Sequence, residues 1–275
     1  MMMPFLVALT SLTLGPVAPL QASNLVLSNV RATHGAFGPT RDSFDLLPGD
    51  TLFLSFDVNG LQLDKAGRYA FATTLQVEDS AGKVIFADSQ TVGPLGNVQS
   101  SLKVRHHLQI ATGLDQAPGA YKCKITVADL NVKGQPGLSQ DASTTRTFNI
   151  LKSDFGLVRT QLTSDAYGRV PTSNVAVSGQ TLYCNVVAAG FQFDRANKEA
   201  ALTFEMSFLD AKNQPVMKQP VVAEFKNIPS ETKYLPLRFD LPLHMAGQYK
   251  VQIKATDEVS KKTAMIVLPV QVMED

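Results

Sequence analysis

The chain contains the same sequence pattern twice, and this repeat constrains its fold more than any other feature. Sliding the sequence by 130 positions places Gly49 on Gly179 and Gly60 on Gly190 without a gap. Twelve of the 38 positions from Thr33 to Ala70 are identical to their partners, where roughly two would match by chance. A repeat of this length predicts two units of the same fold, each large enough to bury a core of its own.

Alternating apolar residues predict that each unit is built of β-strands. Every second residue from Leu52 to Val58 is apolar, and the matching residues from Leu182 to Ala188 repeat the pattern. Period-two patterning of this kind is typical of half-buried strands. Aligning the later strand of each copy, residues 102–110 and 235–241, places His106 on Phe239. With Pro and Gly turns between the strands and no helical periodicity, about seven short strands per copy predict an antiparallel sandwich.

The N-terminal residues predict export. Residues 1–22 contain no charged side chain, and the apolar run from Phe5 to Leu14 is too short to span a bilayer. We therefore expect a signal peptide over residues 1–22, a first sandwich over 23–150, a linker over 151–154 and a second sandwich over 155–275. Because no Lys or Arg precedes the apolar run, an uncleaved N-terminus stays open as the alternative. The short linker predicts two units arranged end to end with restricted motion.

A short motif in each copy carries a resemblance to a known fold family. The run Gly119-Ala120-Tyr121-Lys122-Cys123 resembles the sixth strand of immunoglobulin-like and fibronectin type III-like modules, and Gly247-Gln248-Tyr249 repeats it. The resemblance implies a corner tyrosine whose hydroxyl bonds back to the backbone. The chain has no Trp and no second Cys in the first copy, which departs from the antibody type. It is similar to tandem immunoglobulin-like segments of exported bacterial proteins, which implies a fold but no activity.

The residues that could carry chemistry favour structural roles. Cys123 and Cys184 lie on inward positions of separate units, so we expect two free, buried thiols. His106 and His107 are adjacent on a strand and point to opposite faces, so they cannot hold one metal together. Neither a zinc motif nor a nucleophile elbow occurs in the sequence. We therefore expect no enzyme activity, no cofactor and no metal site.

Asp64 and Asp194 stand at matching positions of the two copies, after a Gly-apolar-Gln-apolar run. The favoured interpretation is a turn-capping carboxylate, and ligand binding is the alternative. The outward aromatics Phe53 and Tyr183 suggest a surface for a partner.

The overall charge and the apolar stretches limit the classes of partner that the chain is expected to bind. A net charge of +1 argues against nucleic acid as a partner. Like the run from Phe5 to Leu14, the other apolar stretches are too short to span a membrane. The leading hypothesis is an exported, non-catalytic binding or structural module at the cell envelope, acting through protein surface contacts. The alternatives are a periplasmic chaperone-like two-domain protein and an accessory carbohydrate-binding module. The partner is left open between another envelope protein and a glycan, and the oligomeric state is undetermined.

If the chain has a specific binding surface, we expect it at the free tip of the first unit. In an immunoglobulin-like strand order, the loop after the second strand and the loop before the last strand share one end. The second loop is an insertion relative to the tight turn Glu258–Lys262 of the other copy, which chain direction places against the first unit. The candidate residues are Asp64, Lys65, Arg68, Asn131, Lys133 and Gln135. A tolerated surface insertion is the alternative.

Overall fold

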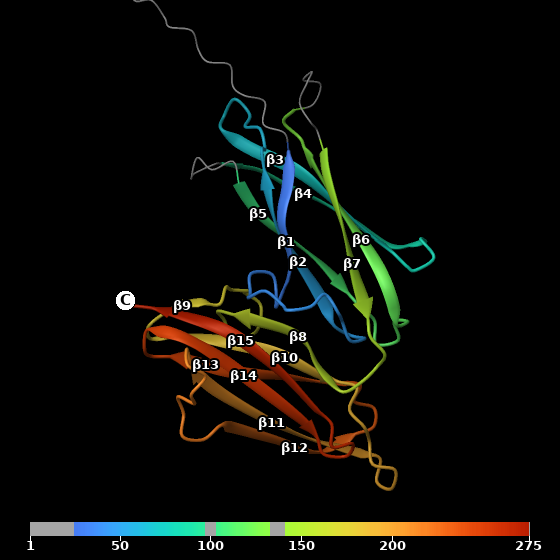
Figure 1. Cartoon of the computed structure of the whole chain (residues 1–275), viewed down its shortest axis with the longest axis vertical. Helices are drawn as coiled ribbons and strands as arrows, with labels where there is room; N and C mark the ends of the chain where they lie inside the picture. The colour runs from blue at the N-terminus through green and yellow to red at the C-terminus, as the bar shows by residue number, and fades with distance from the viewer. Residues whose placement is uncertain (1–24, 97–102, 133–140, 275) are drawn as a thin grey trace, which may run out of the picture.

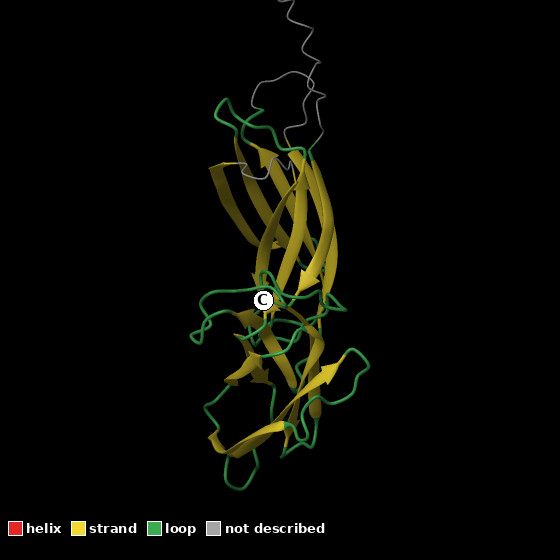
Figure 2. Cartoon of the chain, turned by 90° about the vertical axis from the view of Figure 1, so that its left-hand side faces the viewer, coloured by secondary structure: helices red, strands yellow, loops and turns green. Residues whose placement is uncertain are grey.

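The structure is a computed structural model that describes residues 25–96, 103–132 and 141–274 (Figure 1). Strands and loops make up this part of the chain, and it contains no helix (Figure 2). The predicted class, two immunoglobulin-like β-sandwiches in tandem, is confirmed. The expected signal peptide, residues 1–22, lies outside the described residues. In the described ranges no helix is long and apolar enough to cross a membrane.

Among the described residues, seven strands form the N-terminal sandwich, and they pair in two antiparallel sheets. The strands are β1 (Val26–Thr33), β2 (Thr51–Asn59), β3 (Arg68–Glu78), β4 (Val84–Gly96), β5 (Lys103–Ala111), β6 (Gly119–Asp129) and β7 (Asp141–Ile150). One sheet has the order β1-β2-β5 and the other β4-β3-β6-β7. The inward residues of the two sheets form one apolar core, which includes Leu52, Leu54, Phe71 and Ile125. The period-two pattern therefore maps onto the core face as predicted.

The C-terminal sandwich repeats this order and adds one short strand. Its strands are β8 (Gly156–Thr163), β9 (Val175–Val177), β10 (Gln180–Ala189), β11 (Glu199–Asp210), β12 (Val221–Pro229), β13 (Tyr234–Leu243), β14 (Gly247–Asp257) and β15 (Thr263–Met273). The sheets have the orders β13-β10-β8 and β12-β11-β14-β15-β9. A second, separate core fills the space between them.

One pairing departs from the expected antiparallel pattern. The short strand β9 pairs in parallel with β15, at Val175 and Gln271. After β8 the chain first folds back on itself, with an antiparallel bridge between Thr163 and Pro171, and then continues into β9 beside the last strand. In the N-terminal sandwich the matching contact is an isolated parallel bridge between Leu46 and Ile150.

The corner tyrosines are confirmed in both copies. The hydroxyl of Tyr121 donates to the carbonyl of Ala117 at 2.8 Å, and that of Tyr249 donates to Met245 at 3.2 Å. Each tyrosine follows a glycine by two positions. Gly119 and Gly247 have φ of 148° and 150°, a conformation that favours glycine because it has no Cβ.

The strand register corrects one alignment. Leu54 pairs with Leu108, and Cys184, the repeat partner of Leu54, pairs with Phe239. Phe239 therefore corresponds to Leu108, and His106 corresponds to Leu237 rather than to Phe239. The copies differ in the length of the segments before these strands, so an alignment by apolar period alone slipped by two residues, which keeps the same face inward.

Candidate functional site

The predicted tip of the N-terminal sandwich is held together by its own polar groups. Asp64 accepts hydrogen bonds from the backbone N–H groups of Ala66 and Arg68 at 2.8 and 2.9 Å. Its carboxylate also pairs with the Arg68 guanidinium at 2.9 Å. The backbone and side-chain bonds from Arg68 hold the pKa of Asp64 below its usual value. Asp64 is thus the turn cap that the sequence favoured, and Asp194 caps the matching turn through Ala196.

A buried carboxylate that the sequence analysis missed joins the two loops of the tip. Asp129 accepts from the backbone N–H of Gln62 at 2.7 Å and of Asn131 at 2.9 Å. The side-chain amide of Asn131 donates to the carbonyls of Gln62 and Arg68, both at 2.9 Å. The two loops therefore share one end, as expected. Lys65 is exposed on this tip, while Lys133 and Gln135 lie outside the described residues.

The C-terminal sandwich has an equivalent buried carboxylate that joins two loops. Asp257 is fully buried and accepts from the backbone N–H of Gln192 at 2.9 Å and of Val259 at 3.0 Å. Asp129 and Asp257 each stand eight positions after the corner tyrosine of their copy. That shared spacing is the signal by which the sequence could have revealed them.

The turn from Glu258 to Lys262 lies beside the linker. Lys262 forms an ion pair with Asp154 of that linker. The lower end of the N-terminal sandwich instead contacts strand β8 (Figure 1). The two sandwiches therefore meet end to edge rather than end to end, which corrects the expected arrangement.

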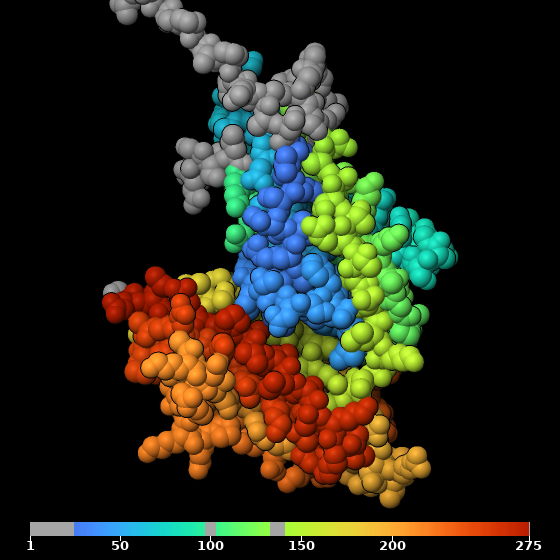
Figure 3. Space-filling model, viewed as in Figure 1, coloured from blue at the N-terminus to red at the C-terminus, as the bar shows by residue number. Residues whose placement is uncertain are grey.

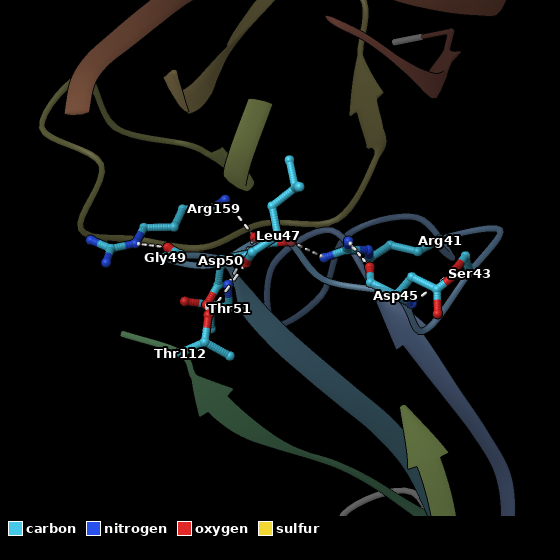
Figure 4. Close-up of polar contacts among 9 residues, drawn as sticks. All are labelled: Arg41, Ser43, Asp45, Leu47, Gly49, Asp50, Thr51, Thr112 and Arg159. Atoms are coloured by element: carbon cyan, nitrogen blue, oxygen red, sulfur yellow. Dashed lines mark hydrogen bonds and ion pairs between the residues drawn. The ribbon is translucent and has the colours of Figure 1, made fainter. Parts of the chain in front are cut away.

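A polar joint connects the two sandwiches (Figure 4). We define the joint as Arg41, Gly49, Asp50, Thr112 and Arg159. Asp50 is only 3% exposed. Its Oδ1 accepts from the backbone N–H of Arg159 at 2.7 Å, and its Oδ2 pairs with Arg41 at 2.9 Å. The Arg159 Nε donates to the carbonyl of Gly49 at 2.7 Å. One carboxylate thus ties the first sandwich to the second.

The backbone around Asp50 is fixed from the other side of its turn. The carbonyl of Asp50 accepts from both the N–H and the hydroxyl of Thr112, at 2.9 and 3.0 Å. Arg41 also donates to the carbonyl of Asp45 at 3.1 Å. Because each group of the joint has several partners, the carboxylate has little freedom to turn away from Arg159.

A β-bulge places Arg159 in the joint. In strand β8 the pairing with β10 shifts between Asn185 and Val187, and Arg159 has a φ of 52°. A bulged residue leaves the hydrogen-bond ladder, so its N–H can bond elsewhere. The same bulge occurs 130 positions earlier, at Asn29, where φ is 53°. There the side chain donates to Asp57 at 2.7 Å within its own sheet. The repeat therefore conserves the bulge, and the second copy uses it to contact the first.

Close backbone approach completes the joint. A Cβ at Gly35 would lie 2.7 Å from Cγ of Gln161, and one at Gly156 would overlap the side chain of Leu47. Figure 3 shows the N-terminal residues, in blue, packed directly on the C-terminal sandwich. The joint is therefore a tight contact rather than a flexible hinge.

One of the two outward aromatic residues, Tyr183, already contacts another side chain of the protein. The guanidinium of Arg238 lies 5.4 Å from the ring centre of Tyr183. Phe53 is half-buried on the outer face of β2. Within the described ranges, no group of three or more His, Cys, Asp or Glu side chains could hold a metal ion.

Comparison with known proteins adds no family. No family model and no curated protein sequence matches the chain. Similar solved structures include the C-terminal domain of the Streptococcus agalactiae AgI/II polypeptide BspA, at 9% identity over 88% of this chain and 99% of that chain, with a TM-score of 0.30. The Streptococcus pyogenes AspA C-terminal domain matches at 8% identity over 91% and 100%, with a TM-score of 0.30.

A third similar structure is latent PorU from Porphyromonas gingivalis. It matches at 11% identity over 93% of this chain and 21% of that chain, with a TM-score of 0.40. At these values the comparisons do not assign the chain to a family.

Proposed function

We propose that this chain is an exported, non-catalytic binding or structural module of the cell envelope that acts through contacts of its protein surface. The joint is the observation that supports this most directly. Asp50 and Arg159 hold the two sandwiches in one arrangement, so their surface loops keep constant relative positions. A preorganised surface loses little conformational freedom when it binds a partner.

The candidate nucleophiles and bases also support a non-catalytic role. Burial raises the pKa of the Cys123 thiol to about 11 and that of Cys184 to about 12, so neither forms a thiolate near neutral pH. Burial lowers the pKa of His106 to about 4. Its ring packs edge-on against Phe56 and Phe71, and its Nε2 is buried.

The chaperone-like alternative has weaker support. Donation of a strand to a client needs alternating apolar side chains along an exposed edge. The edge strand β7 exposes Thr145, Thr147 and Asn149 instead. The proposal therefore keeps the loops of the N-terminal tip as the contact surface, with an envelope protein or a glycan as the partner.

Export is tested by N-terminal sequencing of the protein recovered from the cell envelope and the medium. We expect a start near Ser23. Recovery of the intact Met1 form from the cytosol alone would contradict export.

Surface binding is tested with glycan and peptide arrays probed by the purified protein. We expect a hit that is weakened by Lys65→Ala in the tip and unchanged by Lys83→Ala, another exposed lysine, in the turn between β3 and β4. Replacing residues 131–141 by a four-residue turn should also weaken it. If this shortened protein folds and binds as the wild type does, the tip is not the contact surface.

A further inference from the structure

The outer face of the β1-β2-β5 sheet carries more positive than negative charge. Arg31 on β1 pairs in register with Ser55 on β2, and Arg105 on β5 pairs with Asp57 on β2. Lys103 and Arg105 both approach the Asp57 carboxylate, at 3.0 and 3.4 Å. Lys103 and Arg105 thus share one carboxylate, while Arg31 adds a third cation on β1. Burial alone would raise the pKa of Asp57, but the bonds from Asn29, Lys103 and Arg105 outweigh it and keep the group ionised.

A cavity of about 320 Å³ lies where the C-terminal sandwich meets this face. Arg31, Ser55, Arg105 and Phe37 line it from the N-terminal sandwich, and Thr172 and Ser173 line it from the segment between β8 and β9. That segment is held in place, because the Thr172 N–H donates to the carbonyl of Leu162 at 3.0 Å. The volume is in the range of small-molecule pockets, about 300 Å³ and upward.

Two polar groups that line the cavity have no partner among the described residues. Ser55 is 2% exposed, and its hydroxyl makes no hydrogen bond within the described ranges. Arg31 is half-buried and forms no ion pair there. Arg105 meets Asp57 only through Nε, which leaves its two terminal nitrogens for another acceptor. The Arg105 side chain is 59% exposed, so the cavity offers accessible donors from three strands to a further acceptor.

The donor set determines the kind of ligand. Guanidinium groups bind carboxylate and phosphate oxygens through paired hydrogen bonds. The Phe37 ring is 50% exposed and rests against His107 with ring centres 5.0 Å apart, which provides an apolar wall beside the cations. We propose that this cavity binds a small organic anion whose carboxylate or phosphate group is held by Arg31, Arg105 and Ser55 and whose body lies on Phe37.

This site lies away from the tip loops and does not depend on the partner proposed above. Its walls come from both sandwiches, and the groups that hold the anion come from the N-terminal one.

The test is a calorimetric titration of the purified protein with benzoate and with phenyl phosphate. Benzyl alcohol, which has the ring but no charge, is the control ligand. We expect saturable binding of at least one anion and none of benzyl alcohol, and the stronger anion identifies the group recognised. Arg31→Gln and Arg105→Gln should each weaken binding by at least about tenfold. Lys122→Gln, which removes an exposed charge on β6, should leave the affinity within about twofold.

Thermal unfolding of each variant shows whether it folds. The two arginines lie on different strands, and if one variant does not fold, the other still tests the proposal. The absence of saturable binding of either anion would overturn the proposal. Binding that both arginine variants retain would also overturn it, as would binding that Lys122→Gln weakens equally.

Discussion

His106 is a polar residue at a position that the repeat otherwise fills with an apolar one. Its ring lies between Phe56 and Phe71, with ring centres 5.7 and 5.4 Å away, and its Nε2 has no hydrogen-bond partner among the described residues. Burial, with a smaller contribution from His107, lowers its pKa to about 4. The folded protein therefore keeps this histidine neutral at neutral pH.

The depressed pKa predicts a loss of stability in mild acid. Between about pH 6.5 and 4 the unfolded chain binds a proton at this site and the folded chain does not, so acid favours unfolding. His106 should lower the free energy of unfolding by about 1–2 kcal/mol from pH 7 to pH 5. His106→Leu, which installs the Leu237 counterpart, should reduce the measured loss by this amount. A remainder should persist, because burial also lowers the pKa of His34 to about 4 and the pKa of His107. Replacing the exposed His244 by Leu serves as the control. Urea denaturation at both pH values measures it, and an equal loss in His106→Leu would contradict the assignment.

The two thiols should be inert in the folded protein. Both are free and buried, and their raised pKa values keep them protonated at pH 8. Ellman's reagent should therefore detect no thiol before denaturation and two afterwards. Rapid labelling of a thiol in the folded state would show that Cys123 or Cys184 is accessible.

At the scale of single elements, the sequence predicts what local patterns control. Alternation at Leu52–Val58 locates a strand, and the Gly-x-Tyr spacing locates the corner at Tyr121. The bulge at Arg159 could not be predicted, because one left-handed residue in a strand leaves no apolar signature. Asp129 and Asp257 were missed for a different reason: their partners, Gln62 and Gln192, are distant in sequence.

The corner tyrosines provide a matched test. Tyr121→Phe keeps the buried ring and removes the 2.8 Å bond to Ala117, so it should destabilise the N-terminal sandwich by about 1 kcal/mol. Tyr249→Phe removes a longer bond, 3.2 Å, at a more exposed corner and should cost less. Chemical denaturation of both variants makes the comparison. An equal or reversed order would mean that the hydroxyl bond does not determine the stability of the corner.

At the scale of the whole molecule, the repeat predicts two sandwiches but not their relative orientation. That orientation depends on contacts between residues more than one hundred positions apart, such as Asp50 with Arg159. It also depends on the close approach allowed by Gly35 and Gly156. A candidate site based on loop length alone therefore pointed to the tip, while the cavity between the sandwiches had no sequence signal.

Asp50 should contribute strongly to stability because it is buried and has three partners. Asp50→Ala leaves the Arg41 guanidinium and the N–H groups of Thr51 and Arg159 without their acceptor. We expect a loss of about 2–4 kcal/mol. The control is Asp88→Ala on the exposed strand β4, which should change stability by less than about 0.5 kcal/mol. Urea unfolding compares them, and similar small effects would show that the joint carries little energy.

The central claim is that the joint holds the two sandwiches in one orientation. The direct measurement is the distance distribution between spin labels at Lys124→Cys and Lys226→Cys, one on each sandwich, determined by pulsed electron resonance. Cys123→Val and Cys184→Leu, which install the repeat counterparts, remove the native thiols. We expect a single narrow distribution that broadens in Arg159→Ala, where the bond from Nε to Gly49 is lost. A broad distribution in the protein with Arg159 intact would contradict the claim.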